Sequence, residues 1–217
     1  MRMFAKCLAV CATAAIPLVS QSAMALPSGA FSQIIVDDGW TFEIVACGST
    51  AAGGGSASCG DVTVTALAGS DIGIDIQLAN FSVTGVGAAD VAVQYNVTAP
   101  GTIGKAFLTQ ESTIDSMSGD IVASIVEDLD NGVGADDKME TIDAFFAGMP
   151  SVIKMDMTDL DAATNSLIVT KDINITSFGG SGSISRVTQS FLAVPEPGTA
   201  AMLAGLAIVG AGALRRR

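Results

Sequence analysis

The central part of the chain alternates between apolar and polar residues. The alternation is clearest at residues 61–67 and 72–78, where apolar side chains occupy every second position. Successive side chains of a strand point to opposite faces, so this period indicates half-buried β-strands. Further segments of strand character are residues 33–36, 40–46, 80–84, 92–98, 105–109, 120–127, 141–146, 151–155, 166–175 and 183–191.

Turn signals separate these segments, among them Asp38-Gly39, Ala99-Pro100-Gly101, Asn131-Gly132 and Gly179-Gly180. Only residues 156–163 favour a short turn of helix. Many short strands at a spacing of about ten residues predict an all-β domain, an antiparallel β-sandwich of jelly-roll type. No internal domain boundary is evident between residues 26 and 193.

The first 25 residues form a segment of a different kind. Arg2 and Lys6 precede an apolar run over residues 7–19, and small residues occupy Ala23 and Ala25. The run is too short to span a bilayer, which needs about 20 residues. This arrangement predicts a secretory signal helix at residues 1–25, cleaved after Ala25.

The last two dozen residues have three parts. The sequence Val194-Pro195-Glu196-Pro197-Gly198 precedes an apolar run over residues 199–214, and Arg215, Arg216 and Arg217 end the chain. Prolines on both sides of one residue keep that stretch extended and accessible to a processing enzyme. The apolar run predicts a transmembrane helix about 24 Å long, and the arginines stop transfer on the cytoplasmic side. An ordinary tail anchor is the alternative.

In order and spacing, these three parts resemble the PEP-CTERM sorting signal of Gram-negative bacteria that make extracellular polysaccharide. The resemblance covers residues 194–217 and implies recognition by an exosortase, a membrane protease or transpeptidase that processes the signal near its proline motif. It implies an exported protein that is held transiently in the inner membrane and then moved to the cell surface or beyond. It does not say what residues 26–193 do.

Charge supports the same topology. The formal net charge is −12, and every acidic residue except Glu196 lies between residues 26 and 194. Half of the ten basic residues lie in the two end segments, as the positive-inside rule requires when both ends are cytoplasmic. The acidic domain repels nucleic acid, which we exclude as a partner.

The cysteines predict one disulfide. Cys7 and Cys11 leave with the signal segment, so Cys47 and Cys59 remain. Because export places them in an oxidising compartment, we expect them to pair and close a small loop.

Catalytic chemistry is restricted because the chain has no histidine. This excludes histidine-dependent triads and histidine-bearing metal sites. A carboxylate-based glycan hydrolase remains as a less favoured alternative, although nothing selects a particular acid–base pair. We therefore expect a protein that is not an enzyme.

The acidic stretch at residues 127–137 is a candidate cation site. Asp128, Asp130 and Asp136 offer the oxygen ligands that calcium prefers, and Gly132 permits a sharp turn. The spacing departs from the helix-loop-helix calcium pattern, and a solvated acidic turn is the favoured alternative. No other cofactor is expected.

Carbohydrate binding is a second alternative, with Trp40 as the candidate platform. A single tryptophan in a sandwich more often belongs to the core than to a sugar site. The sequence thus favours a non-enzymatic surface or matrix protein associated with extracellular polysaccharide, with a calcium- or carbohydrate-binding module as the alternative.

Overall fold

The computed structural model describes residues 26, 29–69, 71–115, 119–132, 137–146 and 149–194. The predicted signal segment and residues 195–217 of the predicted sorting signal lie outside this range. Among the described residues, no helix is both long enough and apolar enough to cross a membrane.

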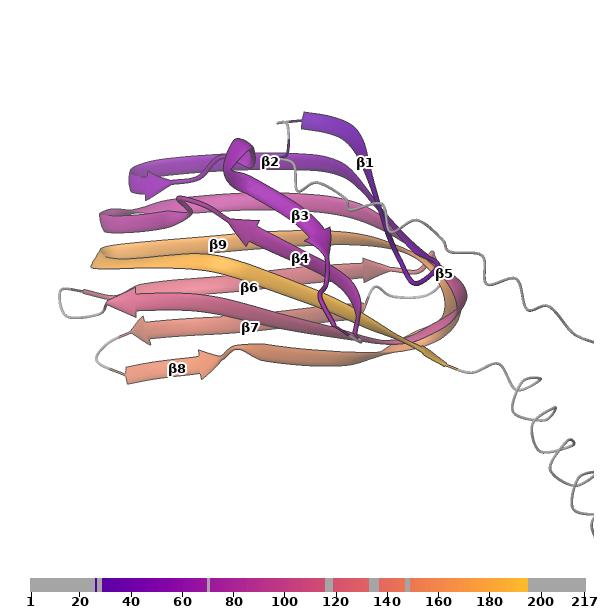
Figure 1. Cartoon of the computed structure of the whole chain (residues 1–217). Helices are drawn as coiled ribbons and strands as arrows, with labels where there is room; N and C mark the ends of the chain where they lie inside the picture. The colour runs from indigo at the N-terminus through magenta and orange to yellow at the C-terminus, as the bar shows by residue number, and fades with distance from the viewer. Residues whose placement is uncertain are drawn as a thin grey trace, which may run out of the picture.

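The described residues form nine strands and one short 3-10 helix (Figure 1). The elements are β1 (Gly29–Asp37), β2 (Trp40–Ser56), η1 (Cys59–Asp61), β3 (Val62–Ala66), β4 (Ile72–Leu78), β5 (Ser82–Asp115), β6 (Ile121–Asp130), β7 (Asp137–Phe146), β8 (Met149–Ile153) and β9 (Met155–Val194). Every pairing between these strands is antiparallel. The prediction of an all-β domain is confirmed.

The helical turn predicted at residues 156–163 is wrong. This segment belongs to β9, where Met157 pairs with Phe107 and Thr158 with Ala106 of β5. A helix of eight residues is marginal without tertiary support, and pairing with β5 satisfies the backbone instead.

The long strands β5 and β9 bend and contribute to two layers. Residues 82–98 of β5 pair with residues 166–183 of β9, whereas residues 102–115 pair with residues 181–194. The first layer contains β1, β2, the first half of β5, the middle of β9, β6, β7 and β8. The second layer contains β3, β4, the end of β9, the second half of β5 and the start of β9. In Figure 1, β3, β4 and the yellow end of β9 lie in front of the first layer.

The core lies between the layers. Trp40 and Phe42 of β2 pack against Phe191 of β9, with ring centroids 6.1 Å and 5.9 Å from that of Phe191. All three side chains are buried. Apolar residues at alternate positions therefore face inward from both layers, as the sequence pattern predicts.

Local sequence explains two features of the first layer. The β1–β2 hairpin turns at Asp38 and Gly39, with φ values of 44° and 82°, the left-handed conformations that a two-residue Asp-Gly turn requires. Residues 53–55 are glycines, and a Cβ atom at Gly54 would lie 1.7 Å from the carbonyl oxygen of Thr84. Glycine there lets the end of β2 approach β5 closely.

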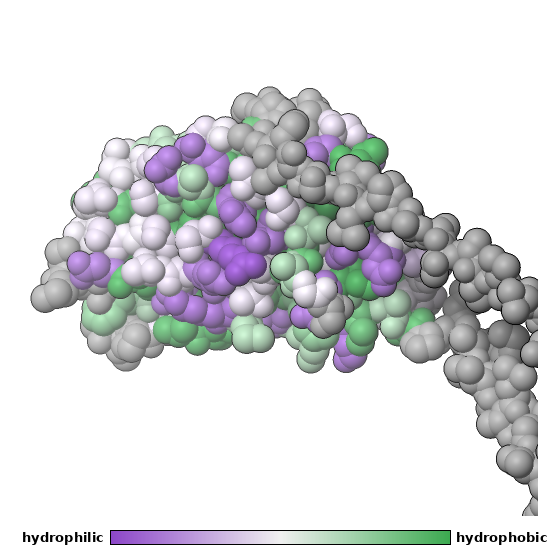
Figure 2. Space-filling view, in the orientation of Figure 1, coloured by the Kyte–Doolittle hydropathy of each residue, from purple (hydrophilic) through white to green (hydrophobic). Residues whose placement is uncertain are grey.

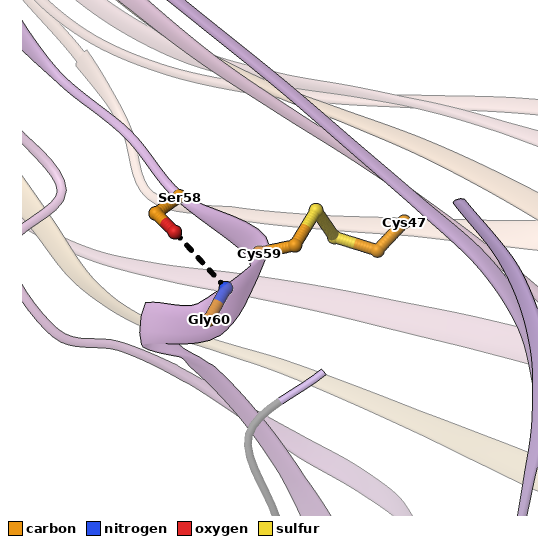
Figure 3. Close-up of a disulfide and its surroundings, with 4 residues drawn as sticks. All are labelled: Cys47, Ser58, Cys59 and Gly60. Atoms are coloured by element: carbon orange, nitrogen blue, oxygen red, sulfur yellow. Dashed lines mark hydrogen bonds between the residues drawn. A yellow bond between two sulfur atoms is a disulfide. The ribbon is translucent and has the colours of Figure 1, made fainter. Parts of the chain in front are cut away.

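The predicted disulfide is confirmed. Cys47 of β2 and Cys59 of η1 are bonded, with a Cα–Cα distance of 6.0 Å, and both are buried (Figure 3). The hydroxyl of Ser58 accepts a hydrogen bond of 3.1 Å from the Gly60 amide and caps η1. The bond joins the first layer to the segment that leads into β3.

Candidate functional site

The outer face of the second layer carries the candidate site. Alternate residues of one strand share a face, so Arg186, Thr188, Ser190 and Leu192 of β9 all point away from the core. Their neighbours Val187, Gln189 and Phe191 are buried between the layers. This face combines an apolar groove with a cluster of charged side chains.

The groove, here called the outer groove, has a volume of about 620 Å³. It is lined by Leu67, Ala68, Asp71, Ile72, Phe107, Thr109, Met155, Thr188, Ser190, Phe191, Leu192 and Ala193. Pairing explains why residues so distant in sequence meet there. Phe107 of β5 lies opposite Ser190 on one side and Met157 on the other, and Thr109 lies opposite Thr188 and Met155.

Apolar surface in the groove is accompanied by hydroxyl groups. Met155 is 72% exposed and Leu192 is 51% exposed, while Phe107 is half-buried. Thr109, Thr188 and Ser190 supply hydroxyls on the same face. A volume of this size is typical of small-ligand sites, which combine apolar walls with a few polar groups.

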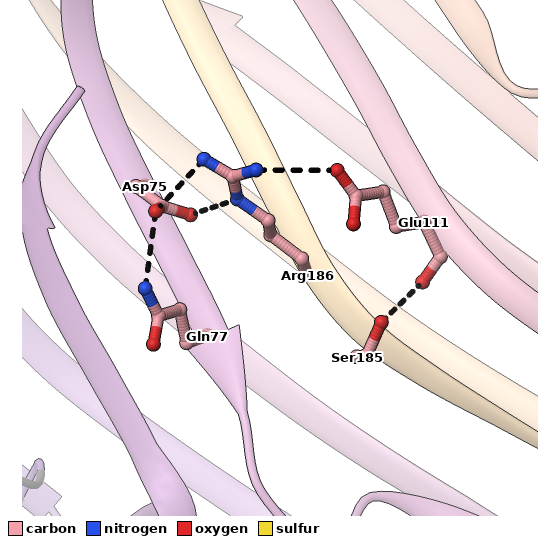
Figure 4. Close-up of polar contacts among 5 residues, drawn as sticks. All are labelled: Asp75, Gln77, Glu111, Ser185 and Arg186. Atoms are coloured by element: carbon pink, nitrogen blue, oxygen red, sulfur yellow. Dashed lines mark hydrogen bonds and ion pairs between the residues drawn. The ribbon is translucent and has the colours of Figure 1, made fainter. Parts of the chain in front are cut away.

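A charged cluster adjoins the groove along the same strands (Figure 4). Arg186 donates two hydrogen bonds to Asp75 of β4, from Nε to Oδ1 (2.8 Å) and from Nη2 to Oδ2 (3.0 Å). Its Nη1 donates to Glu111 of β5 (3.3 Å), and Gln77 donates to Asp75 (3.2 Å). The bidentate geometry fixes the guanidinium plane.

Electrostatics reinforce this cluster. The hydrogen bonds from Arg186 to Asp75, together with the charge of that carboxylate, raise the pKa of the guanidinium. The Arg186 side chain remains 36% exposed and Glu111 56% exposed, while Asp75 is nearly buried. The cluster is thus a fixed polar edge with hydrogen-bonding groups facing solvent. Figure 2 shows a hydrophilic area on this face, with hydrophobic residues nearby.

The described residues that the sequence predicts as functional do not line the outer groove. Trp40, the candidate sugar platform, is 1% exposed and belongs to the core, as the favoured interpretation expected. Asp128 and Asp130 lie in β6 rather than in a loop. Asp128 pairs with Lys138 (2.5 Å), and Asp130 accepts from the Gly132 amide (2.7 Å).

Asp136 lies outside the described residues, as do Ala23, Ala25, Pro195, Glu196, Pro197, Gly198 and Arg215–Arg217. Within the described residues, no three acidic or cysteine side chains are grouped as a metal site. The calcium site therefore stays a prediction. Val194 is the last residue of β9 and is 48% exposed.

Sequence reasoning did not identify the outer groove. Phe107, Met155 and Ser190 come from segments that meet only through the pairing of β5 with β9. The available signal was the alternation in residues 105–109 and 183–191. It shows which side chains face solvent, but not which strands lie beside them.

The end of the chain matches a known family model. Residues 193–217 match the PEP-CTERM protein-sorting motif, and the chain therefore carries this motif. The predicted resemblance is confirmed for this segment. No curated protein matched the sequence.

Several solved structures are similar to the chain at low identity. TmCBM61 in complex with beta-1,4-galactotriose is 11% identical to this chain. The alignment covers 67% of this chain and 88% of the TmCBM61 chain, with a TM-score of 0.34. The enzymatically active domain of tailspike protein 4 from bacteriophage CBA120 is 16% identical, covers 67% of this chain and 19% of its own, with a TM-score of 0.30. A family 35 carbohydrate binding module from Clostridium thermocellum is 13% identical, covers 74% of this chain and 98% of its own, with a TM-score of 0.22. TM-scores this low carry no argument about function.

Proposed function

We propose that this chain is a non-enzymatic surface protein that binds extracellular polysaccharide after exosortase sorting. The PEP-CTERM motif indicates export and processing by an exosortase, and this observation carries the proposal. The motif begins at residue 193, so it overlaps the last two residues of β9, the last described strand. The disulfide between Cys47 and Cys59 supports an oxidising destination.

The proposal divides the chain into three parts. Residues 1–25 are the signal peptide, residues 26–193 are the functional domain, and residues 194–217 hold the chain in the inner membrane until sorting. The two facing layers act as a β-sandwich. After processing, the domain alone reaches the cell surface or the surrounding matrix.

Intact-mass spectrometry of inner-membrane and surface fractions from the native host tests the sorting part. We expect a membrane species that retains residues 199–217 and a surface species that begins at Leu26 and ends near Pro195–Pro197. Alanine at both Pro195 and Pro197 should enrich the membrane species at the expense of the surface species. A surface species with its complete tail would contradict the proposal.

The outer groove supports polysaccharide as the ligand. A sugar ring presents C–H groups on its faces and hydroxyls at its edge, which match Phe107 and the hydroxyls of Thr109 and Ser190. Arg186 and Gln77 add fixed donors and acceptors along the same face. Because the net charge is −12, an uncharged glycan is favoured over an acidic one.

Replacement of Phe107 tests this binding mode. Phe107→Ala should weaken binding to neutral polysaccharide about fivefold, since an aromatic contact contributes about 1 kcal/mol. Phe178→Ala is the matched control, because Phe178 is 63% exposed and does not line the groove. Calorimetry or affinity electrophoresis with a glycan panel measures the effect. Equal losses in both variants, or no binding by the unaltered protein, would reject the groove as the glycan site.

A further inference from the structure

A lysine and a glutamate face each other in the centre of the domain. Lys171 of β9 lies directly opposite Glu127 of β6 in the antiparallel register, and the two side chains form an ion pair. Both side chains are 0% exposed. In the sequence, Glu127 begins the acidic stretch at residues 127–137 and resembles a loop residue. In the structure it occupies an inward-facing position of β6 and lies in the core.

The inward neighbours of this pair along the two strands are apolar. The next inward pairs along the two strands are Ile125 with Ile173 and Leu129 with Val169, and all four residues are buried. Gln189, from the opposite layer, accepts a hydrogen bond of 3.0 Å from the Lys171 amine. Apart from the contact with Lys171, the two carboxylate oxygens of Glu127 have no hydrogen-bond partner among the described residues.

Such an environment destabilises charges on both groups. Removing an ion from water costs several kcal/mol, and mutual attraction offsets this only when further hydrogen bonds complete the pair. Burial lowers the pKa of Lys171 well below its ordinary value. Transfer of a proton from the ammonium to the carboxylate therefore yields a neutral amine beside a carboxylic acid, without exposure to water.

A neutral amine held against a carboxylic acid in a dry core can form an amide. We propose that Lys171 and Glu127 condense into an intramolecular amide crosslink between β9 and β6. Lys171 Nζ attacks the Glu127 carboxyl carbon, Cδ. A C–N bond forms, a C–O bond breaks, and the hydroxyl leaves as water with a proton from the amine. The step needs no oxidant, reductant or cofactor, and the fixed register supplies the proximity.

The product fits the site better than the ion pair does. An amide carries no charge, so the core no longer holds two ions with few hydrogen bonds. The exclusion of water that permits condensation also protects the product from hydrolysis. The amide would join two residues that are 44 positions apart in sequence, on neighbouring strands.

Intact mass of the exported full chain, after reduction of the disulfide, provides the test. The protein should be lighter by one water than the mass calculated from its sequence between the observed termini. Proteolysis should yield a branched peptide that joins the segments containing residues 127 and 171. Lys171→Met should restore the full mass and remove the branched peptide.

A second ion pair on the same strand serves as an internal control. Asp128 and Lys138 also lie directly opposite each other, but their side chains are 42% and 67% exposed. Water competes at this pair, so no peptide joining residues 128 and 138 is expected. The unaltered protein decides the question even if Lys171→Met does not fold. A full mass in the unaltered protein would overturn the proposal, as would loss of ammonia with a link from Lys171 to Gln189.

Discussion

Asp172 and Asp90 place two carboxyl groups close together on the outer face of the first layer. Asp172 lies opposite Ala92, and Asp90 lies opposite Asn174, so the two acids are diagonal neighbours on β9 and β5. Partial burial of Asp172, a hydrogen bond to Asp90 and the charge of Asp90 raise the pKa of Asp172 from 3.8 to about 6. Asp172 thus retains a proton in mildly acidic conditions and donates a hydrogen bond to Asp90.

This shift predicts that the folded domain is stabilised by mild acid. The folded state binds the Asp172 proton more tightly than the unfolded state does. The contribution of this proton to folding stability is therefore complete below pH 3.8 and is lost as the pH rises through about 6. Asp172→Asn should reduce this pH dependence and raise the melting temperature at neutral pH relative to the unaltered protein. Thermal unfolding across this pH range measures it, with Asp71→Asn as a control on an exposed acid. An unchanged pH profile in Asp172→Asn would contradict the assignment.

At the scale of elements, the disulfide fixes η1 and the start of β3 to β2. The Cys47–Cys59 bond closes a loop with a sequence separation of 12, most of it the exposed end of β2 and the glycine run. The second layer begins directly after this bond. Its position predicts a role in holding β3 and β4 against the first layer.

The double replacement Cys47→Ser with Cys59→Ser should lower the free energy of unfolding by about 3 kcal/mol, because the open loop gains entropy in the unfolded state. Denaturant unfolding measures the loss. The unaltered protein under reducing conditions should lose a similar amount of stability, which separates the missing bond from the effect of serine in a buried site. A loss near zero in both cases would show that the bond does not constrain the fold.

Local patterns predicted most strands but not their continuity. Residues 92–98 and 105–109 are predicted as separate strands because Ala99-Pro100-Gly101 reads as a turn, yet β5 bends there and continues into the second layer. Gly179-Gly180 has the same role in β9. Periodicity reports which face of a strand is buried, but the choice between a turn and a bend depends on long-range pairing.

The buried pair of Lys171 and Glu127 shows the same limit of prediction from sequence. Alternation places Lys171 at an inward position between Val169 and Ile173, but a lysine in an exported acidic domain reads as a surface residue. Only the register of β6 against β9 brings Glu127 to it. Recognition of the sorting motif, in contrast, needed no tertiary information, because its parts are contiguous in sequence.

At the scale of the whole molecule, the final strand is central rather than peripheral. Residues 186–191 of β9 lie between β4 and the second half of β5, and the sorting motif begins at residue 193, within the end of the same strand. The domain cannot complete its second layer until the chain has been exported as far as Val194. Folding of the second layer therefore depends on the same end of the chain that carries the sorting motif.

The same arrangement determines how the domain bears mechanical load. If the mature protein is attached through its C-terminal end, tension acts along the axis of β9. The hydrogen bonds to β4 and β5 on its two sides are then sheared together, whereas an edge strand has such bonds on one side only. A protein held at this end bears the load through a strand that is paired on both sides, and a covalent tie from Lys171 to β6 would limit the sliding of β9.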